Sequence, residues 1–149
     1  MEKKLVIACD HAGNEMKEAI IAHLTQAGYD VTDFGCDGTA SVNYPDYAHL
    51  VCNALQEQKA ALGILVCGTG IGMSMAANKH RGIRAALCEN EFSTEMTRRH
   101  NDANVICLGA RVLTVEKALA LVDIFVATEY EGGRHDARVA MLNALDEAK

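Results

Sequence analysis

The stretch LGILVCGTGIGMSMAANK, residues 62–79, decides the fold of this chain. Residues 62–66 are an apolar, partly β-branched run of the kind that forms a strand. A turn with glycines at 68, 70 and 72 follows, and a helix is predicted from there to about Lys79. A strand that passes through a glycine-rich turn into a helix is typical of a parallel sheet with crossover helices.

The same alternation extends on both sides of this stretch. Further strands are predicted at residues 5–9, 29–34, 83–88 and 104–108. Further helices are predicted at residues 14–26, 45–58, 92–99, 114–127 and 134–148, with Pro45 in a first turn and Thr114 as an N-cap. The class is therefore α/β: a doubly wound, parallel, five-stranded sheet of flavodoxin-like or Rossmann-like order 2-1-3-4-5, with an extra C-terminal helix. No repeat or linker interrupts it, so residues 1–149 are expected to form a single domain.

The composition fits a domain of ordinary size and limits the partners. The chain has 149 residues, half of them apolar and 23% charged, so a packed core is expected and disorder is not. The formal net charge of −6 argues against nucleic acid or an anionic membrane as the main partner. A small anion remains compatible, because a few arginines and backbone N–H groups can hold one locally.

The cysteines predict a reduced, cytoplasmic protein. All six stand apart in the sequence, at positions 9, 36, 52, 67, 88 and 107, so a disulfide framework is not expected. The first apolar run, residues 5–9, is too short for a signal peptide. No apolar run approaches the roughly 20 residues that a membrane span needs.

The strand order also predicts where a ligand binds. In a doubly wound sheet, ligands lie outside the carboxyl ends of the strands, at the point where the strand order reverses. Here that point falls between the first and third strands, which are followed by Asp10-His11 and by the glycine turn at residues 67–72. We therefore expect these two segments to converge on one site.

Cys67 is the predicted reactive group of this site. A thiol beside a helix N-terminus and free backbone N–H groups is stabilised as the thiolate. The other interpretation, a buried structural cysteine, is the one we expect for most of the remaining five. At Cys67 the flanking glycines leave little side chain to bury the sulfur, which favours a functional thiol.

The glycine turn does not match three phosphate-binding motifs. A P-loop would need Lys and then Ser or Thr after Gly72, where the chain has Met73-Ser74. A dinucleotide fingerprint would need glycine at 73 or 75, and both are methionine. A cysteine phosphatase loop would need arginine at position 73. What remains is an anion hole beside a thiol, which suits either a phosphate or an enediolate.

Several other polar residues have two interpretations. Asp10-His11 is either a helix-capping aspartate with a surface histidine or a substrate contact, and its place at the switch point favours contact. Arg134 and Arg138 are four residues apart after two glycines, and suit bidentate phosphate binding and a solvated basic face equally. No histidine–carboxylate set has metal-ligand spacing, so no metal is predicted. His23, His49 and His80 are expected at the surface.

Motifs from about residue 5 to residue 138 suggest a family when taken together. They are Asp10-His11, Asn43–Asp46, the turn 67–72 with 76–79, Gly82–Ala85, His100–Asn104, Leu108–Val112 and Gly132–Arg138. In order and spacing they resemble type B ribose-5-phosphate isomerase. That family interconverts ribose 5-phosphate and ribulose 5-phosphate in the pentose phosphate pathway without a cofactor.

The resemblance implies a role for each matching residue. Cys67 would move the proton between C2 and C1, and His100 with Thr69 would open the sugar ring. Met73 stands where the branch of the family without the cysteine has a catalytic glutamate, which places this chain in the cysteine branch. The implied contacts to the enediolate, the hydroxyls and the phosphate are Gly68, Thr69, Gly70, Ile71 and Gly72; Asp10 and Asn101; and His11, Arg111, Arg134 and Arg138, with His135 as a weaker candidate.

Two alternatives stand beside the pentose phosphate isomerase. One is an isomerase of a hexose 6-phosphate, allose or galactose 6-phosphate, as in relatives of the same superfamily. The other is a non-catalytic module that binds a phosphorylated sugar, which would need the arginines and glycines but neither Cys67 nor His100.

The topology predicts a homodimer with shared active sites, or a tetramer built from such dimers. Cys67 follows the third strand at the carboxyl edge of the sheet, whereas His100 precedes the fifth strand at the amino edge. Five strand residues span about 17 Å, farther than a histidine side chain reaches. If both residues serve one sugar, they come from different chains.

Overall fold

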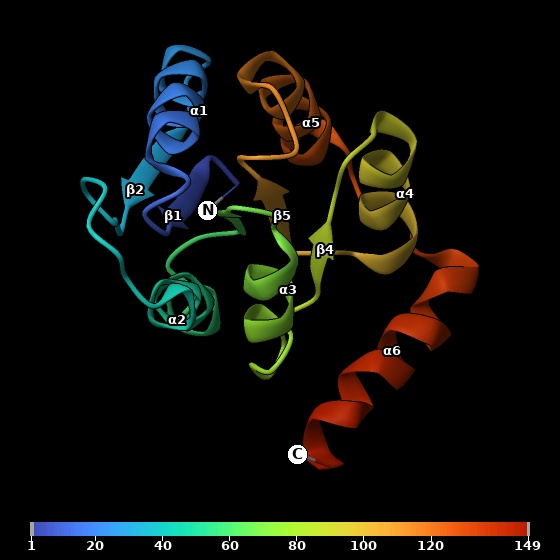
Figure 1. Cartoon of the computed structure of the whole chain (residues 1–149). Coiled ribbons are helices and arrows are strands. Elements are labelled where there is room, and N and C mark those ends of the chain that lie inside the picture. Colours follow the sequence, from blue (N-terminus) through green and yellow to red (C-terminus); the bar gives the residue numbers. More distant parts are fainter. Residues whose placement is uncertain (1, 149) are drawn as a thin grey trace.

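The computed structural model describes residues 2–148, which form one five-stranded parallel sheet flanked by helices (Figure 1). The strands are β1 (Lys4–Cys9), β2 (Asp30–Asp33), β3 (Leu62–Cys67), β4 (Ala85–Leu87) and β5 (Val105–Gly109). The helices are α1 (Asn14–Gln26), α2 (Tyr44–Gln56), α3 (Ile71–Ala77), α4 (Glu91–Asn101), α5 (Val115–Ala127) and α6 (Asp136–Ala144), with 3₁₀ turns η1 (Gly133–His135) and η2 (Leu145–Ala148). The predicted α/β class and C-terminal helix are confirmed; Met1 and Lys149 of the predicted 1–149 domain lie outside the described residues.

The order of the last two strands differs from the prediction. The observed order is β2-β1-β3-β5-β4, so the predicted order 2-1-3-4-5 is wrong at this edge. Burial gives the physical reason. All five residues of β5 are buried, as a strand between two others requires, whereas β4 has only three residues, each half-buried. The longer apolar strand takes the inner place and the short one takes the edge.

Alternating side chains divide the core into two layers. Along β1, Ile7 packs on the face covered by α1 and α5, whereas Val6 and Ala8 pack on the face covered by α2 and α3 (Figure 1). The inner strands β1, β3 and β5 therefore need apolar residues on both faces, which explains their continuous apolar runs, whereas the edge strand β2 is mostly exposed. Within residues 2–148, no helix has the length and apolar character to span a bilayer.

Helix starts follow the capping residues in the sequence. The predicted N-cap Thr114 is confirmed, since its side chain accepts a hydrogen bond from Lys117 N at 3.1 Å. Asn90 does the same for α4, accepting from Ser93 N at 2.8 Å. Pro45 lies in the first turn of α2, where its missing N–H removes no helical hydrogen bond. These caps set where the helices begin, and with them the loops at the strand ends.

The C-terminal helix extends away from the sheet (Figure 1). Asp146 and Asn143 tie it to the segment before β4, through Gly82 N at 2.7 Å and Arg84 Nη1 at 3.0 Å. The apolar side chains of Met141, Leu142 and Leu145 stay exposed on it. The predicted single helix over 134–148 is in fact a 3₁₀ turn, α6 and a second 3₁₀ turn.

A buried ion pair fixes the loop after β2 to α1. Lys17 of α1 is fully buried, and its Nζ lies 2.9 and 2.8 Å from the two carboxylate oxygens of Asp33. Asp33 Oδ1 also accepts a hydrogen bond from Gly35 N at 2.8 Å. Burial alone would lower the pKa of Lys17, but the hydrogen bond and charge of Asp33 outweigh it and raise the pKa.

We expect Lys17→Met to lower the free energy of unfolding by about 2–3 kcal/mol, because Asp33 loses its charged partner but is partly exposed and can regain water. The pair stabilises fully below the unfolded lysine pKa of about 10.4 and is lost as the pH rises through the raised folded value. Urea unfolding at neutral pH measures the difference. The matched control Lys59→Met, at an exposed lysine paired with Glu57, should change stability by less than about 0.5 kcal/mol. Equal losses in the two variants would contradict the importance of the buried pair.

Candidate active site

Cys67 is the last residue of β3, and its thiol is held inside the glycine turn. The residue is only 5% exposed, so the expectation that the flanking glycines leave its sulfur unburied is wrong; the neighbouring strands and loop bury it. Its Sγ accepts a hydrogen bond from Gly70 N at 3.2 Å. A backbone N–H directed at sulfur stabilises negative charge on it. The carbonyl of Cys67 accepts a bond from Ala110 N at 2.8 Å, which joins the turn to the end of β5. The thiol is thus positioned by two strand ends.

The glycines of the turn are required by close backbone approach. Gly70 has φ +79°, and a Cβ there would lie 2.6 Å from Leu87 Cδ1 and 3.0 Å from the carbonyl carbon of Leu108. At the end of the neighbouring strand β5, a Cβ at Gly109 would lie 2.7 Å from the Thr69 carbonyl oxygen. The turn is therefore pressed onto the end of β5. A bulkier residue at either glycine would displace the loop that holds the thiol.

Asp10 and His11 lie beside this turn, as the switch-point argument predicts. Asp10 N donates to Val66 O at 3.0 Å, so the ends of β1 and β3 are adjacent. The Asp10 carboxylate accepts from Ala12 N at 2.9 Å, while the N-cap of α1 is Gly13. Asp10 therefore closes a turn and does not cap the helix. His11 Nδ1 accepts from Val42 N at 3.2 Å, which assigns the proton of a neutral ring to Nε2.

Two more side chains border the glycine turn. The Arg111 guanidinium lies over Gly68, where a Cβ would be 3.2 Å from its Nη1, and Arg111 N donates to Gly68 O at 2.9 Å. The Tyr44 ring lies against Gly72, where a Cβ would be 2.7 Å from it. Tyr44 was not among the predicted site residues; its signal in the sequence is its place directly before Pro45. We call Asp10, His11, Cys67–Gly72 and Arg111 the carboxyl-edge group.

His100 and Asn101 end α4 at the other edge of the sheet. The helix stops at Asp102, which has φ 48°. Arg84 Nε donates to Asp102 O at 2.9 Å, and Arg98 Nη1 donates to Asp102 Oδ1 at 3.1 Å. Arg98 thus has a structural part at the C-terminus of the helix. This network holds the helix end and positions the two residues before it.

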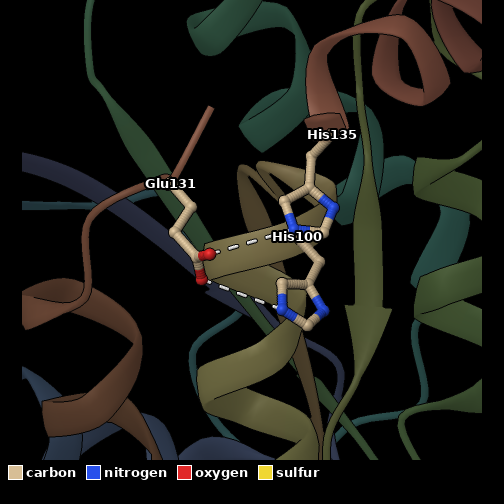
Figure 2. Close-up of side chains that lie close together, drawn as sticks. All are labelled: His100, Glu131 and His135. Atoms are coloured by element: carbon tan, nitrogen blue, oxygen red, sulfur yellow. Dashed lines mark ion pairs between the residues drawn. The ribbon is translucent and has the colours of Figure 1, made fainter. Parts of the chain in front are cut away.

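His100 lies in a cluster with Glu131 and His135 (Figure 2). The imidazole rings of His100 and His135 stack with centroids 4.2 Å apart and planes 18° apart. Their Nε2 atoms lie 3.8 and 4.0 Å from the two Glu131 carboxylate oxygens. The sequence showed no histidine–carboxylate set, because His100 comes from a helix end far from the other two. Folding brings these three side chains together, and the absence of a bound metal stays a prediction.

Arg134 and Arg138 lie next to this cluster and are exposed. Arg134 belongs to η1 and Arg138 to α6, so they do not share one regular helix as predicted. Burial lowers the pKa of His135, and the charges of His100 and Arg134 lower it further. We call His100, Asn101, Arg134 and Arg138 the amino-edge group.

The two groups lie apart within one chain. In the β3–β5 pairing, Cys67 is opposite Gly109 and Gly63 is opposite Val105. His100 precedes Val105, so the whole length of β5, about 17 Å, separates the levels of the two groups. The structure therefore brings the carboxyl-edge group together and the amino-edge group together, but does not join them.

Four of the other five cysteines have thiols whose pKa is raised by burial. All six cysteines are free and buried, as expected of reduced thiols. Burial raises the pKa of Cys9 and of Cys52 to about 12, and it also raises the pKa of Cys88 and of Cys107. These four thiols stay protonated near neutral pH. Cys67 differs from them in that a loop N–H points at its sulfur.

A groove of about 460 Å³ lies elsewhere, between α4, the β4 edge and α6. Asn101 is the one predicted site residue that lines it. Apolar Leu142 and Leu145 form part of its wall, so it continues the exposed apolar face of α6. The groove therefore adds no wall to the carboxyl-edge group.

The fold and the carboxyl-edge group define a doubly wound α/β enzyme with a thiol set in a glycine-rich loop. Comparison with known proteins gives the particular family. The family model described as Ribose/Galactose Isomerase matches residues 5–142. Ribose-5-phosphate isomerase B of Escherichia coli is 42% identical over 147 residues, covering 99% of each chain.

Solved structures agree with the sequence match. Ribose-5-phosphate isomerase B of Clostridium thermocellum superposes with a TM-score of 0.96 at 43% identity, covering 97% of this chain and 98% of that one. The Mycoplasma genitalium enzyme with bound ribulose 5-phosphate gives a TM-score of 0.93 at 38% identity, covering 98% and 97%. The chain belongs to the ribose/galactose isomerase family and, within it, to the type B ribose-5-phosphate isomerases. It is an isomerase.

Proposed function

We propose that this chain interconverts D-ribose 5-phosphate and D-ribulose 5-phosphate, with Cys67 as the base. The observation that carries the proposal is the Cys67 thiol at the switch point of the sheet, with Gly70 N directed at its sulfur. The relatives described above support the choice of a pentose phosphate over the hexose 6-phosphates. The six free thiols fit a reducing compartment, so we also propose a cytoplasmic enzyme.

The isomerisation moves one proton from C2 to C1 and a second from O2 to O1, and it needs a place for negative charge. The Cys67 thiolate removes the proton from C2 of the open-chain aldose, and the electron pair moves to give an enediolate with the charge on oxygen. The thiol then returns the proton to C1 while the proton of the O2 hydroxyl passes to O1, which yields the ketose without any net gain or loss of atoms. Backbone N–H groups of residues 68–72 and the Arg111 guanidinium stabilise the oxyanions in this scheme. No redox cofactor enters this balance.

Ring opening requires an acid–base side chain besides Cys67, and His11 of the carboxyl-edge group serves the phosphate in this proposal. We assign ring opening to the partner subunit's His100, assisted by Thr69, because the His100 of the same chain is a strand length away. A two-fold dimer makes two equal sites, each with residues from both chains. The exposed Met141, Leu142 and Leu145 of α6 supply apolar surface for such a dimer, and pairing of dimers would give a tetramer.

The same arrangement assigns residues of both chains to the phosphate and the hydroxyls of the substrate. His11 and Arg111 of one chain and Arg134 and Arg138 of the partner subunit hold the phosphate in this proposal. His11 suits the role because its Nε2 proton is free to be donated once Nδ1 accepts from Val42 N. Asp10 and Asn101 of the two chains contact the sugar hydroxyls.

Incubation of the purified chain with ribose 5-phosphate, and separately with allose 6-phosphate, tests the proposed function. Ketose should form from the pentose phosphate and more slowly, or not at all, from the hexose phosphate. Activity should persist in EDTA, since no step uses a metal. Faster turnover of allose 6-phosphate would make the hexose phosphate the assigned substrate. Binding of both sugar phosphates without formation of any ketose would favour the non-catalytic module.

We expect Arg138→Ala to raise KM for ribose 5-phosphate roughly ten- to hundredfold, the usual effect of losing a hydrogen bond to a charged group. The change in kcat should be small. Unphosphorylated ribose should be a poor substrate for both proteins and should lose little further. Arg81→Ala, at another exposed arginine that pairs with Glu147, is the control and should leave KM unchanged. Equal losses for ribose and its phosphate would contradict the phosphate contact.

A further inference from the structure

The cluster of His100, Glu131 and His135 contains an atom that the proposed reaction leaves unexplained. His135 is only 5% exposed. Within the described part of the chain, its Nε2 is the one buried side-chain nitrogen or oxygen without a hydrogen-bond partner. Buried polar atoms are satisfied in most proteins, so an unsatisfied one asks for a ligand or another role. This nitrogen faces the Glu131 carboxylate, as does the Nε2 of His100 (Figure 2).

The three side chains have the donor set and spacing of a transition-metal site. Two imidazoles and one carboxylate are ligands that zinc prefers, and their ligand atoms all lie within 4.8 Å of one another. Zinc bonds of about 2.0–2.1 Å in a tetrahedron place neighbouring ligand atoms about 3.3 Å apart. The observed separations of 3.8 and 4.0 Å from Glu131 need to close by only a fraction of an ångström. Rotation of the half-exposed Glu131 side chain can supply this.

A backbone hydrogen bond holds one of these ligands in place, whereas the two rings must rearrange. Glu131 N donates to Arg99 O at 3.0 Å, which fixes the carboxylate beside the end of α4. The stacked imidazole planes are only 18° apart, so the two Nε2 lone pairs are nearly parallel, and one ring must turn out of the stack before both bind the same ion.

Other charges near the cluster limit the affinity. Arg134 and Arg138 act on His135 electrostatically and oppose a second positive ion there, while Glu131 favours one. Arg99 is paired with Glu95 at 2.9 Å, so its charge is partly balanced. One carboxylate and two neutral imidazoles against two arginines give a site weaker than a structural zinc centre, whose ligands carry more negative charge. The same arginines favour an anion as the fourth ligand.

We propose that His100, Glu131 and His135 form a capture site for a divalent transition-metal ion of the zinc type, with the fourth position open. A metal bound there occupies Nε2 of His100 and holds this side chain away from the sugar. The ion is therefore an inhibitor and not a cofactor. This consequence for activity rests on the proposed role of His100, whereas the metal site itself does not.

Zinc chloride titrated into the full, metal-free chain and followed by calorimetry tests the site. Glu131→Gln keeps the size and polarity of the side chain but removes its charge, and should weaken zinc binding about tenfold or more. His80→Asn is the matched control, because it removes the other close imidazole pair, in which His49 Nδ1 lies 3.0 Å from His80 Nε2. That control should bind zinc as the parent does. Equal affinity in the Glu131→Gln variant and the parent would overturn the proposal.

Cobalt(II) distinguishes this cluster from the thiols. Cobalt held by histidine and glutamate absorbs in the visible range without the intense sulfur-to-metal charge-transfer band that cysteine ligation gives. The parent should show the visible absorption alone, and His135→Asn should lose it. A circular dichroism spectrum like that of the parent would show that the His135→Asn variant is folded. A sulfur charge-transfer band in the parent would place the ion at a cysteine and refute the site.

Activity measurements separate the two parts of the inference. Zinc should inhibit the parent, EDTA should restore its activity, and Glu131→Gln should need about tenfold or more zinc for the same inhibition. If calorimetry and cobalt spectra place the ion at the cluster but turnover is unaffected, the metal site stands and the role of His100 in ring opening is wrong. If zinc inhibits the parent and Glu131→Gln equally, the inhibition arises elsewhere and the capture site is refuted.

Discussion

Replacing Cys67 by alanine should lower kcat by several orders of magnitude and leave substrate binding largely unchanged. The thiolate acts on the C2 proton only as the transition state is approached, so its loss affects kcat far more than KM. A positioned general base typically raises the reaction rate about 10²–10⁴-fold. In the glycine turn, residues 67–72, Cys67 is the one side chain that can act as a base. Steady-state kinetics with ribose 5-phosphate gives kcat and KM. Calorimetry gives the affinity for the sugar phosphate in a separate measurement.

Cys52→Ala is the control for the loss of a thiol. Cys52 is fully buried in α2, and burial raises its pKa to about 12, so it has no thiolate to offer. Its replacement should cost stability but leave kcat close to that of the parent protein. Near-normal turnover in Cys67→Ala would remove the thiol from the mechanism. An equal loss of kcat in both variants would show that the effect is structural.

Mixing inactive Cys67→Ala and inactive His100→Ala proteins should restore activity. In a mixed dimer with shared sites, one site carries both lesions and the other carries neither. Random exchange at equal amounts makes half of the dimers mixed, so about a quarter of all sites become intact. The gain over two proteins that are each almost inactive is therefore very large. Activity measured before and after exchange, with the two subunits carrying different tags, gives the result.

The outcome of the mixing experiment depends on demonstrated exchange. Co-purification of the two tags shows that mixed dimers formed. Mixing Cys67→Ala with a differently tagged Cys67→Ala protein is the control and should stay inactive, because every site then lacks the base. If tagged heterodimers form from the two different variants and the mixture remains inactive, each site is built within one chain, and the proposed arrangement is refuted.

Much of the fold could be predicted because local signals and burial agree. Helix α1 has the predicted bounds Asn14–Gln26, and strand β3 differs by one residue from its apolar run. The order of β4 and β5 could not be read in the same way, since both strands are apolar and both are followed by helices or turns. What decides the order is the complete burial of β5 within the sheet, which depends on partners distant in sequence.

The carboxyl-edge group could be predicted from the sequence, whereas the cluster at the amino edge could be predicted only in part. Cys67 and the glycine turn are contiguous in sequence, so strand, turn and helix signals place them at one edge. Glu131 and His135 carry no such pattern. They meet His100 only because the segment after α5 binds the end of α4, through the bond from Glu131 N to Arg99 O. Contacts of this kind between irregular segments leave no periodicity for a sequence to reveal.

The inner position of β5 has a consequence for how the chain folds as it is synthesised. β4 pairs with β5 alone, and β5 in turn pairs with β3. A chain growing from its N-terminus therefore presents β4 before its partner strand exists, although β1, β2 and β3 can already pair. Residues 85–104 must wait for β5 to insert beside β3, and this non-local step closes the sheet. Closure of the sheet is thus delayed until residues 105–109 leave the ribosome, and α4, which carries His100 between β4 and β5, cannot reach its final place before then.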